Sequence, residues 1–223
     1  MSTSTLLDAL QDAIRASLTE LNTCIPAVVL SYDASSQKAT VQPTVKRWYR
    51  DNTSPSRPPI TGVPVVFPAA GGGIISFPIA AGDTVMLMFS QTSLDKWLVS
   101  SGGEVNPEDR RLHDYSDAIA IPGLVPFQNS LHSDPDSVII KYKGNKIQLA
   151  PDGSVTIDAP SGHIINGDTV VNGTLVVTNA VTAASVTSPG AIAGNSLSAN
   201  GLDMGTHVHT GDSGGTTGPA RSA

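Results

Sequence analysis

The sequence predicts a mainly β protein with three parts: one N-terminal helix, a small antiparallel barrel, and a C-terminal shaft built from three copies of the chain. Three observations support this fold class. Helical spacing of apolar residues occurs only near the start, within residues 4–21. Residues 24–103 hold β-rich runs separated by turns. From residue 137 onward, strand-length pieces alternate with turns and the sequence carries very little charge.

The composition narrows the class of protein before any motif is considered. With 21 Gly, 16 Pro and 4% aromatic residues in 223, many short strands are favoured over long helices. A net charge of −6 argues against nucleic-acid binding. The one cysteine, Cys24, indicates synthesis in a reducing compartment. With no signal-peptide pattern and no long apolar run, we expect a chain that is made as a soluble cytosolic protein.

The predicted N-terminal helix belongs to a segment spanning residues 1–23. Thr5 and Asp8 form a capping-box pattern that marks its start. Its apolar stripe recurs at three- and four-residue steps: Leu7, Leu10, Ile14, Leu18 and Leu21. Such a stripe packs either on its own domain or on a partner or neighbouring subunit, and the sequence leaves both open.

Residues 24–103 read as a barrel domain. The predicted strands are 26–32, 38–49, 63–67, 74–79, 84–89 and 94–99. Five or six short antiparallel strands in about 80 residues suit a small barrel such as an OB-fold. Many OB-folds bind oligonucleotides, and Trp48 and Tyr49 do lie among basic residues. One such cluster in an acidic chain does not indicate nucleic-acid binding, so we expect none.

The segment 104–136 reads as a linker rich in proline and polar residues. It contains His113, Asp114 and Ser116, three residue types that form catalytic triads. A triad requires a spatial arrangement that neighbours in sequence do not provide, and no glycine pattern surrounds a candidate nucleophile. We therefore expect no catalytic role here.

The segment 137–203 has the composition of a repetitive β-structure. The turns Ala150-Pro-Asp-Gly153 and Ala159-Pro-Ser-Gly162 recur nine residues apart, and Tyr142 is the last aromatic residue. From Ile147 onward only six of 77 residues are charged. One such chain has too few large side chains for a core and would expose unpaired strand edges. We therefore predict an intertwined β-helix of three chains; a disordered tail is disfavoured by the regular Val, Ile and Leu content.

The last segment, 204–223, contains the candidate metal ligands His207 and His209. In an extended backbone, side chains two residues apart point to the same face. Two imidazoles are too few for most transition metals, but three chains would supply six nitrogens around one axis. The sequence thus predicts a metal-binding apex, and ligand type alone does not separate Fe from Co, Ni or Zn.

These features together resemble a known family. The piece Gly82-Asp-Thr-Val-Met-Leu-Met-Phe89, the connector Arg111-Leu-His-Asp-Tyr-Ser-Asp-Ala118 and the terminal His207-Val-His209 resemble the central spike, or baseplate assembly protein V, of contractile-tailed bacteriophages. The resemblance covers nearly the whole chain beyond the first helix. Its most specific feature is the order of barrel, linker, low-charge shaft and His-x-His tip.

The resemblance implies a homotrimer in the virion, at the tip of the tail baseplate. In this family the barrel collar binds the baseplate hub proteins, and the needle pierces the host outer membrane when the tail contracts. It further implies one iron ion per trimer held by His207 and His209 of each chain, with calcium or chloride also found in some tips. Some relatives insert a lysozyme domain, for which the linker here is too short, so we expect no enzymatic activity.

An alternative of another class is a trimeric β-helical tail fibre that binds or degrades surface polysaccharide. Glycosidases of this kind need paired carboxylates beside aromatic sugar platforms. The shaft has scattered Asp residues, no Glu, and no aromatic residue after Tyr142. The spike interpretation is therefore favoured.

Overall fold

The computed structural model describes residues 5–49, 52–194, 198–199 and 202–203. The chain divides into two units, Met1–Ile157 and Asp158–Ala223. The helices of the first unit are α1 (Leu6–Glu20), α2 (Asp95–Leu98) and the 3₁₀ turn η1 (Phe127–Asn129). Its strands are β1 (Cys24–Asp33), β2 (Lys38–Pro43), β3 (Ile60–Pro64), β4 (Ala69–Ala70), β5 (Gly73–Ile74), β6 (Thr84–Phe89), β7 (Ala118–Pro122), β8 (Val138–Tyr142), β9 (Asn145–Leu149) and β10 (Val155–Asp158), the last reaching one residue into the second unit. Two short strands follow in the second unit, β11 (Ser198–Ala199) and β12 (Leu202–Asp203).

Helix α1 begins at the predicted capping box. The backbone N–H of Thr5 donates to the Asp8 carboxylate at 2.9 Å, and the N–H of Asp8 donates to the Thr5 hydroxyl at 3.2 Å. These two bonds satisfy donors that the first turn would otherwise leave open. None of the described side chains of α1 is buried. The helix therefore does not pack its stripe against its own domain.

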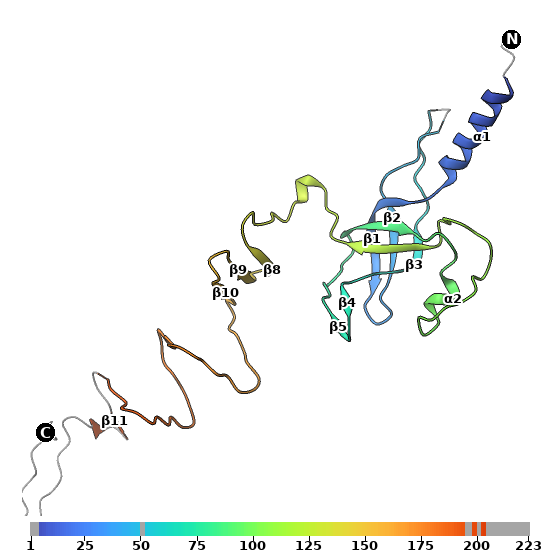
Figure 1. Cartoon of the computed structure of the whole chain (residues 1–223). Helices are drawn as coiled ribbons and strands as arrows, with labels where there is room; N and C mark the ends of the chain where they lie inside the picture. The colour runs from blue at the N-terminus through green and yellow to red at the C-terminus, as the bar shows by residue number, and fades with distance from the viewer. Residues whose placement is uncertain (1–4, 50–51, 195–197, 200–201, 204–223) are drawn as a thin grey trace, which may run out of the picture. The chain divides into compact units, whose positions relative to one another are not determined.

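A five-stranded antiparallel sheet, in the order β3-β2-β1-β6-β7, curls into a half-barrel (Figure 1). Its outer members, β3 and β7, approach each other: Val65 and Ala120 form a parallel bridge, and the N–H of Val66 donates to the carbonyl of Ala120 at 2.9 Å. The order around the resulting ring is β1-β2-β3-β7-β6. Joining its edges in this way covers backbone groups that an open sheet would expose.

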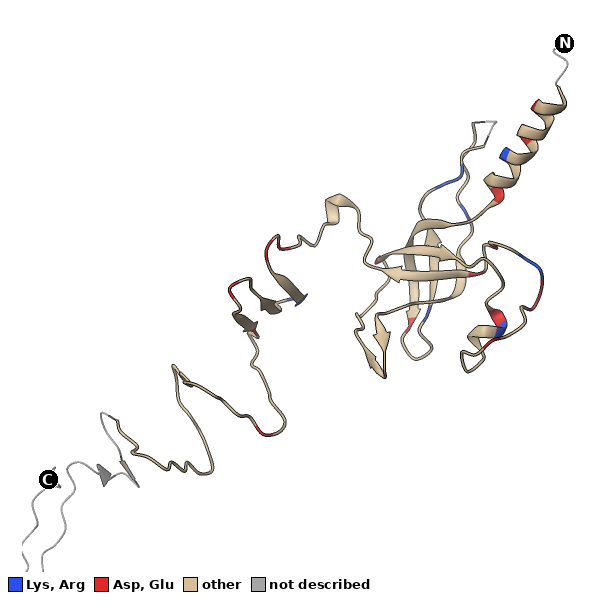
Figure 2. Ribbon diagram, viewed as in Figure 1, with Lys and Arg blue, Asp and Glu red and all other residues tan. Residues whose placement is uncertain are grey.

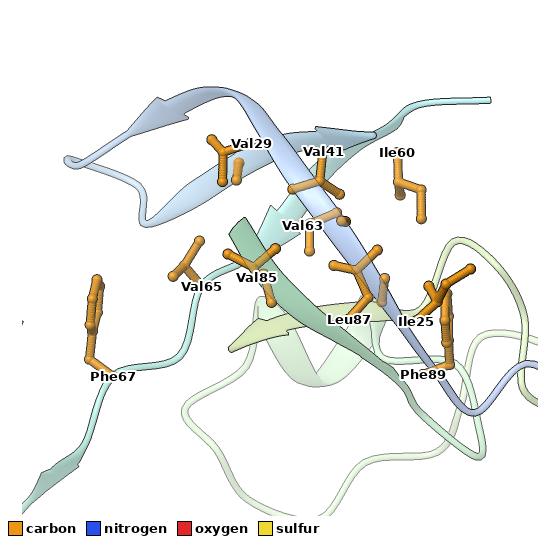
Figure 3. Close-up of a cluster of buried hydrophobic side chains, with 14 residues drawn as sticks. Ile25, Val29, Val41, Ile60, Val63, Val65, Phe67, Val85, Leu87 and Phe89 are labelled. Carbon is orange, nitrogen blue, oxygen red and sulfur yellow. The ribbon is translucent and has the colours of Figure 1, made fainter. Parts of the chain in front are cut away.

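The core of this sheet comes from alternating positions, as expected when one face of each strand turns inward. Leu87 and Val41 have no exposed surface, and Val85 and Val29 have 1% each. Figure 3 shows them together with other side chains of this core, among them Ile60 and Val63 of β3. The complete cluster is Ile25, Ala27, Val29, Ala39, Val41, Ile60, Val63, Val65, Phe67, Val85, Leu87, Phe89, Ala118 and Ala120.

Three predictions for this region are wrong. The run 74–79 is not a strand: only Gly73–Ile74 pairs, with Ala69–Ala70, and residues 75–80 form no helix or strand. The run 94–99 is not a strand: α2 occupies Asp95–Leu98, because Leu94, Trp97 and Leu98 have the i, i+3, i+4 spacing of a helix turn. The segment 104–136 is not only a linker, since it supplies the barrel strand β7. In β7 the inward residues are Ala118 and Ala120, whose small side chains give little hydrophobic signal.

Strands β8, β9 and β10 form a separate three-stranded sheet, in the order β10-β9-β8. The turn between β8 and β9 is tight, and Lys143 has a positive φ of 52° there. In the second unit, the described residues 159–194 contain no helix or strand. The predicted β-helix is therefore not seen in the described part of this single chain.

Candidate functional site

The three-stranded sheet presents one uncovered apolar face. Val138 lies opposite Leu149, and Ile140 lies opposite Ile147, so these four side chains share a face of the β8–β9 hairpin. Their exposed fractions run from 40% to 64%. The other face is held by polar contacts: Lys146 donates to Gln148 at 3.0 Å, and Gln148 donates to Ser137 at 3.0 Å. The apolar face is thus the one left open to solvent.

Exposed apolar side chains also occur before and after this sheet. Between residues 121 and 194, all of which the structure describes, no side chain is buried. Ile164, Val170 and Val176 are each about four-fifths exposed, at 83%, 81% and 78%. Asp168 is the only charged residue from 159 to 194, so this part of the ribbon is almost uniformly tan in Figure 2. Monomeric proteins rarely expose a contiguous apolar surface of this size.

The predicted metal ligands His207 and His209 lie outside the described residues. In the described part of the chain, no group of three or more His, Cys, Asp or Glu side chains is placed to hold a metal ion. The donor set itself is informative, because two imidazoles per chain fit a first-row metal ion only when several chains contribute. The apex thus stays a prediction from the sequence.

The residues that resemble a catalytic triad do not form one. The Ser116 hydroxyl donates to the Asp114 carboxylate at 2.6 Å, which lowers the pKa of Asp114 and closes a local turn. His113 Nδ1 is buried and has no hydrogen-bond partner among the described residues. In a triad the serine donates to the histidine and the histidine donates to the aspartate; here Ser116 donates to Asp114 instead, so this cluster is a turn.

The aromatic and basic cluster around Trp48 anchors α1. The Arg47 guanidinium lies 3.1 Å from the Glu20 carboxylate and also donates to the carbonyl of Thr19. It lies 5.7 Å from the centre of the Tyr49 ring. Hydrogen bonding to Glu20 raises the pKa of Arg47. This charge is therefore neutralised within the chain, and it ties the end of α1 to the loop after β2.

A second ionic cluster was not singled out by the sequence. Arg111 Nε donates to Asp117 at 2.6 Å, and its other nitrogens reach Asp95 at 2.6 Å and Asp109 at 2.8 Å. Asp117 is only 3% exposed and also accepts from the N–H of Leu94 at 3.0 Å. The Arg111 hydrogen bonds lower the pKa of Asp117. This network fastens the segment around α2 to the start of β7.

Comparison with known protein families supplies the class of protein. Residues 25–123 match the family model described as the phage protein Gp138 N-terminal domain. The match spans the curled sheet from β1 to β7 and includes just under half of the chain. It supports a structural role in a phage particle. No curated protein matches the chain. The described residues contain no helix long and apolar enough to cross a membrane.

Proposed function

We propose that the chain is the central spike of a contractile phage tail baseplate, acting as a homotrimer that pierces the host outer membrane. The observation that carries the proposal is the long exposed apolar surface of the described residues 121–194, none of which has a buried side chain. The same chain carries a domain that matches a phage protein family, which supports a role for this surface in a phage particle. A shaft made of three chains would bury the apolar faces and pair the strand edges.

The barrel is proposed to be an OB-fold collar that contacts the hub proteins of the baseplate. Its support is the ring order β1-β2-β3-β7-β6, with a parallel contact where β3 approaches β7. Closure by this contact makes the collar a firm base for a shaft that must transmit force. The chemistry required of the chain is mechanical, so we propose that it is not an enzyme and binds no nucleic acid.

The apex is proposed to hold one iron ion per trimer through His207 and His209 of each chain; Co, Ni or Zn suits the same ligands, and calcium or chloride is a possible further ion of the tip. Such an ion would tie three chain ends together, and its binding free energy would add to the stability of the assembled tip. The protein's place is then the virion, after synthesis in the host cytoplasm.

The test combines mass photometry with elemental analysis on one purified sample. We expect a trimer with one metal ion for three chains. A monomer would contradict the spike proposal, whereas a trimer without metal would contradict only the apex.

A matched pair of variants sharpens the test of the shaft. Ile140→Asp places a carboxylate on the apolar face of β8, where a trimer would bury it without a partner, so we expect a shift toward monomers. Lys141→Asp places the same group one residue away, on the opposite face, and should leave the trimer intact. An unchanged mass for Ile140→Asp would show that this face is not an interface.

A further inference from the structure

We infer that the α1 helices of three chains pack together through their apolar stripes, forming a three-helix bundle at the collar end of the assembly. The inference rests on the proposed homotrimer. It assigns an interface to an element outside the matched phage domain, which begins at residue 25.

The stripe of α1 is broad and continuous. At about 100° per residue, Leu6, Leu7, Leu10, Ile14 and Leu18 fall within a sector of about 120°. Their exposed fractions in the single chain are 88%, 61%, 56%, 51% and 64%. A 15-residue helix is marginal in water without tertiary contacts, so a stripe of this kind requires a partner.

The chain's own barrel does not supply that partner, because it holds the helix from another side. The groove between α1 and the loop after β2 is lined by Arg47, Trp48 and Tyr49 and, on the helix, by Asp12, Arg15, Ala16, Ser17, Thr19 and Glu20. Except for Ser17, these helix positions lie about 100° or more from the centre of the stripe. The Arg47 contacts with Glu20 and Thr19 therefore fix the helix end while the stripe stays free.

Charge argues against a lipid surface as the occupant. Asp8, Asp12 and Glu20 outnumber the one basic residue of the helix, Arg15. Helices that bind anionic membranes carry Lys and Arg along their polar face. An acidic helix with a leucine-rich stripe suits protein–protein packing instead.

A second and third copy of α1 are the occupants that the trimer itself provides. Three identical stripes would start from equivalent points of one assembly, so each helix meets its neighbours at a high effective concentration. A sector of about 120° is wider than the narrow seam of a two-stranded coiled coil and matches a helix that contacts two neighbours. Three-fold packing would thus cover every stripe in a closed arrangement.

Disulfide trapping in the full chain tests this packing, with Cys24→Ser as the background. Ile14→Cys places a thiol in the stripe, and Asp12→Cys places one about 160° around the helix as the matched control. Under mild oxidation we expect Ile14→Cys to give covalent dimers at a rate independent of protein concentration, at least about tenfold faster than Asp12→Cys. Adding Leu10→Asp should abolish the Ile14→Cys cross-link, whereas adding Ala9→Asp should preserve it.

Mass photometry of the same samples separates failure of this inference from failure of the proposed function. A trimer in which both cysteines react equally, or neither reacts, would mean that α1 does not bundle and that its stripe serves another protein. A monomer would overturn the homotrimer, and the helix bundle with it.

Discussion

Asp117 and Arg111 show how one buried carboxylate can hold together a segment with little core of its own. Asp117 accepts hydrogen bonds from two nitrogens of Arg111, at 2.6 and 2.9 Å, and from the backbone of Leu94. Replacing Asp117 takes the buried partner from Arg111, which keeps only Asp95 and Asp109, and leaves the N–H of Leu94 without its acceptor. We expect Asp117→Ala to lower the free energy of unfolding of the barrel by about 2 to 4 kcal/mol.

Denaturant unfolding, followed by tryptophan fluorescence, measures this effect. The control is Asp109→Ala, which removes the exposed, outer partner of the same guanidinium. We expect that change to cost less than about 1 kcal/mol. Equal losses in the two variants would mean that burial of Asp117 is not what makes the network important.

The same network predicts a pH dependence. Hydrogen bonds from Arg111 lower the pKa of Asp117 in the folded state, so in acid the unfolded chain takes up a proton more readily. The contribution of Asp117 is complete above the unfolded pKa of about 3.9, and it is lost as pH falls through the lower folded value. The stability difference between wild type and Asp117→Asn should therefore shrink below about pH 4. Thermal unfolding between pH 7 and pH 3 measures this stability difference. A difference that grows in acid would contradict a lowered pKa of Asp117 in the folded state.

Strand β6 carries the centre of the barrel core. Leu87 has no exposed surface, whereas its neighbour Met88 points to the opposite face and is 41% exposed. We expect Leu87→Ala to lower the free energy of unfolding by about 3 kcal/mol, because it removes buried methyl groups and leaves a cavity. Met88→Ala should cost less than about 1 kcal/mol. Chemical denaturation of both variants checks this, and similar losses would contradict the inward direction of Leu87.

Strand β6 also shows what the sequence reveals and what it hides at the level of elements. Its alternation of Val85, Leu87 and Phe89 predicts the strand Thr84–Phe89 that is observed. Strand β7 escapes notice because Ala118 and Ala120 are small, although they are needed where β3 approaches β7. Segment 94–99 is misread because four residues are too few to separate helical from strand spacing. Strand β7 forms through pairing with strands that are distant in the sequence, and a local sequence pattern does not reveal such pairing.

At the scale of the whole molecule, the sequence predicts that the C-terminal part of one chain cannot fold around a core by itself. The described part of the structure is consistent with that prediction. Low charge and few large side chains from Ile147 onward imply that one chain cannot form a core there. The described residues 121–194 indeed bury no side chain. What three copies would do together depends on contacts between chains, which no single-chain property determines. The proposed metal site of His207 and His209 also depends on contacts between chains, so their role stays a prediction.

Removing the metal tests whether an ion at the apex stabilises the assembled trimer. If six imidazoles clamp the three chain ends, the metal-free trimer should keep its mass but lose thermal stability in the shaft, since only the assembled state binds the ion. The His207→Ala/His209→Ala variant should behave like the chelated wild type and should not respond to chelator. Unfolding of the barrel on metal removal is not expected, because its core comes from β1, β2, β3, β6 and β7 of one chain. We expect two unfolding transitions, of which only that of the shaft shifts to higher temperature with added metal. A metal response that is retained in the double variant would mean that the ion binds elsewhere.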